Sequence, residues 1–331
     1  MVDGEGFEPY ERRNSCSGLF RAFFAVKMSL VVLEARWAAD MNGPKNIAAS
    51  VKARLQNVAE KRGEEFNLVL ARYGIERLLF RLSRSQYADR FLLKGAMLFA
   101  VWDDKTHRPT RDLDLLGFGP TEKEALVRVF REVVATPVPS DGLDFDPDSV
   151  RAEEIREDNT YGGVRVRLMG MLGKAQVPIQ IDVGAGDAVT PAPEMAVFPV
   201  LLDFPAPHIR AYPVYTVVAE KFEAMVRLGA ANTRLKDFYD LWFLAQRLDF
   251  DGPTLARALR ATFDRRQTVV PQEVPAALTG RFAEDRAGMW QAFLRRNGHG
   301  PITFAEVVTV IRDFLAAPIR AAADGSDWRH V

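Results

Sequence analysis

Residues 91–119 read FLLKGAMLFAVWDDKTHRPTRDLDLLGFG, and this stretch decides the fold that we expect. An apolar run ends at KGA (94–96), a short apolar helical segment follows, and a polar loop at 103–110 leads to RDLDLL at 111–116. In that last segment Asp112 and Asp114 alternate with leucines. Because a strand sends residues i and i+2 to one face, both carboxylates leave one side of the strand while Leu113 and Leu115 enter a core.

The two carboxylates on this expected strand repel each other unless a positive charge lies between them. Mg²⁺ prefers oxygen ligands and is commonly held by one or two carboxylates together with substrate phosphates. A half-exposed edge strand with two solvated acids is the alternative, and for an isolated D-x-D it is the more common explanation. The small-residue turn and short helix upstream favour a metal site.

This order of turn, short helix, loop and acidic strand resembles the DNA polymerase β-like nucleotidyltransferases. The resemblance implies that the turn formed by Lys94, Gly95 and Ala96 approaches the nucleotide phosphates. It also implies that Asp112 and Asp114 hold Mg²⁺, with Mn²⁺ as a possible substitute. The family usually has Gly-Ser where this chain has Gly95-Ala96, so a hydroxyl contact to phosphate is missing. Backbone N–H groups at the start of the helix remain available to the phosphates.

A third carboxylate is expected on a later strand. Residues 177–183 read VPIQIDV, in which Asp182 alternates with buried isoleucine and valine positions. In polymerase β-like enzymes a third acid arrives on a neighbouring strand, and the resemblance assigns Asp182 to the metal site and to the attacking hydroxyl. An ordinary acid at the end of a strand is the alternative.

The charge balance and the first forty residues limit the class of protein. The chain has 331 residues with 44 Lys+Arg and 44 Asp+Glu, so any nucleic-acid contact needs a local basic patch. A single cysteine excludes an intrachain disulfide and fits a reducing cytoplasm. The apolar run at 19–33 is too short and too charged to span a bilayer. We expect residues 1–40 to be a disordered leader or the product of an upstream start, with an amphipathic membrane anchor as the alternative.

The remaining pattern predicts a mixed α/β (α+β) nucleotidyltransferase domain at 41–212 and a helical domain at 213–331. Apolar spacing predicts helices before the turn, a helix after the acidic strand that begins with a Thr121–Glu124 capping box, and a closing helix at 304–315 with a frayed tail from 321. We interpret the acidic segment 141–148 as a solvated turn and the proline-rich segment 191–213 as a crossover with at most one short strand. Further strands are predicted at 150–157, 163–172 and 177–183.

A second signature lies on two predicted helices, at 216–228 and 233–247. It reads AEKFEAMVRL at 219–228 and RLKDFYDL at 234–241. With the acidic strand, it resembles the AbiEii/AbiGii (MenT-type) nucleotidyltransferase toxins. The resemblance implies that Lys221 contacts the triphosphate and that Asp237 and Asp240 orient Lys221 or the nucleotide. Lys236 would add a phosphate contact.

The resemblance therefore implies a cytoplasmic, Mg²⁺-dependent toxin that moves NMP from an NTP to an RNA acceptor, most plausibly the 3′ end of tRNA, and blocks translation. It also implies a separately encoded antitoxin, and no membrane. Eight arginines between 251 and 300 indicate either a basic face for RNA or ordinary solvated helix faces. Two other functions stay open: a transferase acting on a protein or a small molecule such as an antibiotic, and a degenerate, non-enzymatic nucleotide-binding module.

Overall fold

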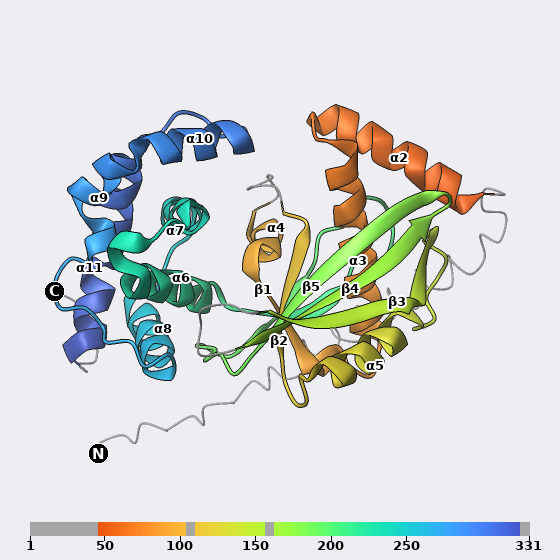
Figure 1. Cartoon of the computed structure of the whole chain (residues 1–331), viewed down its shortest axis with the longest axis horizontal. Helices are drawn as coiled ribbons and strands as arrows, with labels where there is room; N and C mark the ends of the chain where they lie inside the picture. Colours follow the sequence, from red (N-terminus) through yellow and green to blue (C-terminus); the bar gives the residue numbers. More distant parts are fainter. Residues whose placement is uncertain (1–45, 104–109, 156–161, 325–331) are drawn as a thin grey trace, which may run out of the picture. The chain divides into compact units, whose positions relative to one another are not determined.

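The computed structural model describes residues 46–103, 110–155 and 162–324, and residues from Ala48 on form one compact unit. Its centre is a seven-stranded mixed sheet with strand order β3-β4-β5-β2-β1-β7-β6 (Figure 1). The strands are β1 Phe91–Lys94, β2 Asp112–Gly117, β3 Leu143–Ile155, β4 Gly163–Leu172, β5 Ala175–Ala185, β6 Glu194–Val197 and β7 His208–Ala211. The α-helices are α2 Ile47–Arg62, α3 Phe66–Arg84, α4 Phe99–Trp102, α5 Lys123–Val134, α6 Val214–Leu228, α7 Leu235–Arg247, α8 Gly252–Arg265, α9 Gly280–Asp285, α10 Ala287–Asn297 and α11 Phe304–Asp324. The predicted fold class, a mixed sheet followed by a helical C-terminal region, is confirmed.

Alternation along the central strands gives the sheet one apolar and one polar face. Leu113, Val166 and Ile181 are buried in the same core cluster as Leu79 of α3 and Phe130 of α5. α3 packs on β5 and α5 packs on β3, so these two helices cover the apolar face. The polar residues that alternate with the buried ones on β2, β4 and β5 therefore lie on the opposite face.

Helix α3 approaches the sheet closely because of a glycine. A Cβ atom at Gly74 would lie 2.7 Å from Val177 Cγ1, which is too close for a real side chain. The same helix carries buried charged side chains, including Arg81, which forms an ion pair with Asp141 at 2.7 Å. The prediction that 141–148 is a solvated turn is therefore wrong: Asp141 is 2% exposed, and residues 143–148 belong to β3. The strand predicted at 150–157 accordingly begins earlier, at Leu143.

Three other boundaries differ from the prediction. The segment 191–213 contains two strands, β6 and β7, where at most one was predicted. β7 pairs in parallel with β1 and so uses the backbone groups on the edge of β1 that does not face β2. The N-cap of α5 is Glu122 without a side-chain hydrogen bond, so the predicted Thr121–Glu124 capping box is wrong. α11 continues to Asp324, and Ala321 and Ala322 are buried, so the predicted fraying is wrong for 321–324, the part of the tail that the structure describes.

The helical C-terminal region is built around packed aromatic rings. Phe304 stacks on Trp290 with ring centroids 4.8 Å apart and contacts Phe238 at 5.1 Å. Among the described residues, no helix is both long enough and apolar enough to cross a bilayer. The predictions for residues 1–40 and for most of the loop at 103–110 fall outside the described residues. The domain boundary near 212 stays a prediction.

Candidate active site

The structure brings the two strand signatures together on the polar face of the sheet. β2 and β5 run in parallel, and their register pairs Asp114 with Asp182 and Asp112 with Gln180. Paired residues on neighbouring strands lie about 5 Å apart and point to the same face. Asp112 is exposed and Asp114 is intermediate, whereas Leu113 and Leu115 are buried. All three predicted acids therefore lie on one surface at the centre of the sheet.

The glycine turn lies against this surface. Gly95 has φ +70°, in the left-handed region that favours glycine, and follows directly after β1. A Cβ atom at this position would overlap the carboxylate of Asp114. Because Lys94 pairs with Asp114 in the β1–β2 register, the turn is fixed beside the acid by strand pairing. Gly95 and Ala96 begin the short 3₁₀ turn that continues to Leu98.

The surroundings of Asp114 are those of a cation-binding carboxylate. Burial raises its pKa, and Asp182 and Asp112 raise it further, whereas Lys94 and Lys236 act in the opposite direction. A divalent cation would offset the repulsion, and carboxylate oxygens suit Mg²⁺. Among the described residues, no ready-made group of three or more His, Cys, Asp or Glu side chains surrounds a metal position. A site completed by substrate phosphates needs only one or two carboxylates, so this pair fits Mg²⁺.

Two of the acids are paired with polar side chains that the sequence analysis did not identify. Arg165 of β4 donates from Nε to Asp182 Oδ1 and from Nη2 to Asp182 Oδ2, both at 2.8 Å. Gln180 Nε2 donates to Asp112 Oδ1 at 2.9 Å. The sequence contains a pattern that could have identified Arg165: in the segment VRVRL at 164–168 the arginines alternate with buried apolar residues. That alternation places Arg165 on the polar face of the sheet.

The second signature forms a compact buried cluster on α6 and α7. Lys221 Nζ lies 2.8 Å from Asp237 Oδ1 and 2.7 Å from Asp240 Oδ2. Asp240 is fully buried, and Arg234 Nε donates to the second oxygen of Asp237 at 2.6 Å. Burial alone would lower the pKa of Lys221, but the two carboxylates outweigh it and raise the pKa. Lys221 is thus a charged ammonium in a fixed position, held by both acids of the motif.

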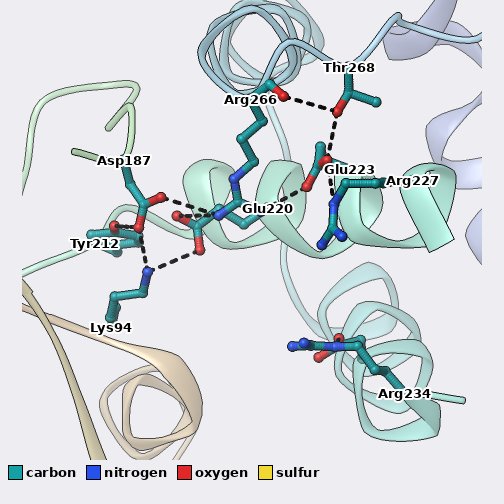
Figure 2. Close-up of polar contacts among 10 residues, drawn as sticks. Lys94, Asp187, Tyr212, Glu220, Glu223, Arg227, Arg234, Arg266 and Thr268 are labelled. Carbon is teal, nitrogen blue, oxygen red and sulfur yellow. Dashed lines mark hydrogen bonds and ion pairs between the residues drawn. The ribbon is translucent and has the colours of Figure 1, made fainter. Parts of the chain in front are cut away.

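A third cluster joins β1 to the helices (Figure 2). Lys94 Nζ lies 2.6 Å from Asp187 Oδ2 and 3.4 Å from Glu220 Oε2. Arg266, just after α8, approaches the same two carboxylates at 3.3 and 3.4 Å. Burial would raise the pKa of Asp187, but Lys94 and Arg266 together outweigh burial, and the pKa falls to about 2. The structure therefore places the ammonium of Lys94 between two carboxylates beside the acid surface, and its contact with phosphate stays a prediction.

Three residues of this third cluster, Asp187, Glu220 and Arg266, were given no site role by the sequence analysis. Asp187 lies after β5 and Arg266 after α8, 79 positions apart. No local spacing connects them, so only the tertiary structure shows that they meet. Glu223 of α6 also accepts from Arg266, at 2.8 Å, and is fully buried.

The arginines of residues 251–300 divide into two groups. Arg260, Arg265 and Arg286 donate to backbone carbonyls of the protein, and Arg266 lies in the third cluster. The other four, Arg257, Arg281, Arg295 and Arg296, are exposed, and so is Arg265. The surface available for a basic RNA-binding face in this segment is therefore smaller than the sequence alone indicates.

Comparisons with known proteins found two distant structural likenesses and one family match. Two solved structures from Helicobacter pylori resemble the chain at 14% sequence identity. One is JHP933, which covers 77% of this chain and 94% of its own with a TM-score of 0.45. The other, described as a nucleotidyltransferase, covers 77% and 95% with a TM-score of 0.41. No curated protein matches the chain.

A family model gives the decisive match. The model of the nucleotidyl transferase AbiEii toxin, type IV toxin–antitoxin system, matches residues 77–313, which is more than half of the chain. The matched span contains the glycine turn, the acid strands and the Lys221 helix pair. The chain therefore belongs to the AbiEii nucleotidyl transferase toxin family of type IV toxin–antitoxin systems.

Proposed function

We propose that this nucleotidyltransferase is a cytoplasmic toxin that transfers NMP from an NTP to RNA, most plausibly to the 3′ end of tRNA, and so blocks translation. Three carboxylates on one sheet surface, with a glycine turn packed against Asp114 and a fixed lysine on α6, carry the proposal. Family membership implies an NTP substrate and an antitoxin partner. The RNA acceptor is the finer part of the proposal and needs its own test.

The proposed metal ligands are Asp112 and Asp114, with Asp182 as the third acid. Mg²⁺, or Mn²⁺ in its place, would neutralise the charge of the nucleotide phosphates when it is bound there. Asp114 is suited to this role because burial and its neighbouring acids make its negative charge costly until a cation is present. Asp112 retains its second oxygen for a cation while the first accepts from Gln180.

The other proposed residues act on the triphosphate. Gly95 and Ala96 lack long side chains, so the backbone of the turn is open to close approach by a phosphate. Lys221 supplies a fixed ammonium, and Asp237 and Asp240 hold it in place. Lys236 is exposed and close enough to lower the pKa of Asp114, so it can meet a phosphate near the acids. Lys94 would contribute positive charge from beneath the turn.

In the proposed reaction a hydroxyl oxygen of the acceptor forms a bond to the α-phosphorus of the NTP. The bond between the α-phosphorus and the oxygen that bridges to the β-phosphate breaks, and pyrophosphate leaves. The hydroxyl proton passes to Asp182 or to water. Catalysis then comes mainly from positioning and from charge placed where the phosphates gain negative charge.

A labelling experiment with the full chain tests the proposal. The protein is incubated with total tRNA, Mg²⁺ and each of the four α-labelled NTPs, beside Asp114→Asn and Lys221→Met. Asp144→Asn serves as a matched control, because Asp144 is an exposed acid on β3. We expect label on tRNA with one or two nucleotides, loss of label in the first two variants, and no loss in the control.

The other outcomes separate the alternatives. Label on a protein or on a small molecule, with none on RNA, would refute the RNA acceptor while keeping nucleotidyl transfer. No transfer to total RNA, protein extract or small-molecule acceptors, with an NTP still bound, would refute catalysis and leave a nucleotide-binding module.

A further inference from the structure

The contact between Arg165 and Asp182 engages both oxygens of the third acid. Arg165 lies directly opposite Asp182 in the antiparallel register of β4 and β5. Both oxygens of Asp182 accept from its guanidinium at 2.8 Å. A bidentate pair of this kind is among the stronger hydrogen-bonded contacts in proteins. Asp182 is therefore engaged by a cation of the protein itself.

This engagement competes with the role proposed for Asp182. Asp182 lies beside Asp114 in the β2–β5 register, so its carboxylate can reach a cation held there. A guanidinium on both oxygens repels a divalent cation at short range and takes one lone pair of each oxygen, so it competes with a cation for Asp182. Asp182 and Arg165 must separate before Asp182 can join the other two acids at a metal.

The sheet offers Arg165 a second carboxylate. In the register of β3 and β4, Glu153 lies directly opposite Arg165, on the side away from Asp182. Directly opposed side chains have Cβ atoms about 5 Å apart, within reach of an arginine. Glu153 now pairs with Arg167 at 2.8 Å, and both of those side chains are about half exposed. Arg165 itself is 29% exposed, so it is not confined by packing.

We propose that Arg165 is a positioning residue that keeps Asp182 out of the metal site in the free protein and releases it by turning towards Glu153 when a divalent cation binds at Asp112 and Asp114. The inference rests on the proposed function, because it takes those two acids as metal ligands. Binding of the cation and rotation of Arg165 are then coupled. Occupancy of the metal site completes the set of three acids.

Direct Mn²⁺ binding to the full chain, measured by electron paramagnetic resonance without nucleotide or acceptor, tests this coupling. Arg165→Gln should bind Mn²⁺ roughly five- to tenfold more tightly than the wild type, because Asp182 is free from the outset. Arg165→Lys should fall between them, since an ammonium cannot hold both oxygens in the same fork. Glu153→Gln should bind more weakly than the wild type, because it removes the second position for Arg165.

Two controls separate release of Asp182 from a general change of charge. Arg151→Gln removes an exposed arginine from β3 and should leave Mn²⁺ affinity unchanged. In an Asp182→Asn background, Arg165→Gln should no longer tighten binding. A gain that persists in that background, or equal affinity of wild type and Arg165→Gln, would overturn the proposal. Urea unfolding of each variant checks that the protein remains folded.

The outcome is distinguishable from failure of the proposed function. Transfer of label to tRNA without tighter Mn²⁺ binding in Arg165→Gln would refute this coupling alone. Tighter binding that depends on Asp182, without transfer to any RNA, would support the coupling and refute the RNA acceptor.

Discussion

Two regions of this protein hold charged side chains against the sheet, and the two regions differ in the charges that surround each side chain. On α3, Arg81 donates to both oxygens of Asp141 and to the carbonyl of Leu143 at 3.1 Å, and Asp141 accepts from the Leu143 N–H. On the polar face, Asp112, Asp114 and Asp182 lie beside one another; burial, and after it the charges of the other two acids, raise the pKa of Asp114. The first region matches each charge with a partner from the chain. The second brings like charges together.

Like-charged neighbours, in addition to burial, distinguish the candidate catalytic acids from the scaffold charges. A buried ion pair with further hydrogen bonds fixes a contact between two elements. Adjacent acids repel each other: Arg165 offsets the charge of Asp182, and a bound cation would offset the charge of Asp112 and Asp114. Lys221 shares a feature with each region. Like a scaffold charge it is neutralised by partners from the chain, Asp237 and Asp240, and like the acid surface it remains accessible, with 14% of its side chain exposed.

The largest expected effect lies on the acid surface. Asp114→Asn should reduce nucleotidyl transfer on the order of a thousandfold, because it removes the charge that the proposed metal and phosphates need. Folding should be retained or improved, because the substitution relieves repulsion from Asp182 and Asp112. Transfer rates and urea unfolding check both parts. A large loss of stability would show that Asp114 is a scaffold charge like Asp141, and would contradict the distinction between the two regions.

The opposite pattern is expected at Asp141. Asp141→Asn leaves the charge of Arg81 buried without its anion, which costs roughly 3–5 kcal/mol of unfolding free energy. Transfer per folded molecule should stay unchanged, because neither residue belongs to the acid surface. Replacing the pair together, with Arg81→Met and Asp141→Leu, should recover most of the loss. Failure of the double variant to recover would show that the backbone hydrogen bonds dominate.

Glu76, a buried acid on the same helix α3, makes the stability of the protein depend on pH. Burial raises its pKa to about 7, although Arg77 and the N–H of Leu201 oppose the shift. Between the ordinary pKa near 4.5 and about 7, the folded protein holds a proton that the unfolded chain has released. Stability should therefore fall as pH rises through this window, by at most roughly 3 kcal/mol.

Urea unfolding of the wild type and Glu76→Gln across that pH range checks this contribution. The variant lacks the titrating group, so its curve should be flatter than that of the wild type. Parallel curves would show that Arg77 and Leu201 hold Glu76 ionised throughout, as a fully matched scaffold charge would be.

The sequence predicted those parts of the site whose residues are close along the chain. Asp112 and Asp114 are two apart on a strand, and Asp237 and Asp240 are three apart on a helix, so spacing alone put each pair on one face. Asp182 needed the family resemblance as well. The pairing of Asp187 with Arg266 spans 79 positions, and no periodicity predicts it. The buried state of Asp141 was missed for the same reason, because its partner Arg81 lies 60 positions earlier.

The smallest expected effect comes from the glycine turn, which lies against Asp114. Gly95→Ala places a methyl group against the carboxylate of Asp114 and strains a backbone with φ +70°. We expect a loss of about 1–2 kcal/mol in stability and a fall in transfer of about ten- to a hundredfold, because Asp114 must move. Gly63→Ala is the matched control: its φ is +64°, but its Cβ atom would meet nothing within 4 Å. It should show the same kind of backbone strain without the fall in transfer. Equal transfer by the two variants would mean that Asp114 tolerates displacement, and the close packing of turn and acid would then belong to the scaffold.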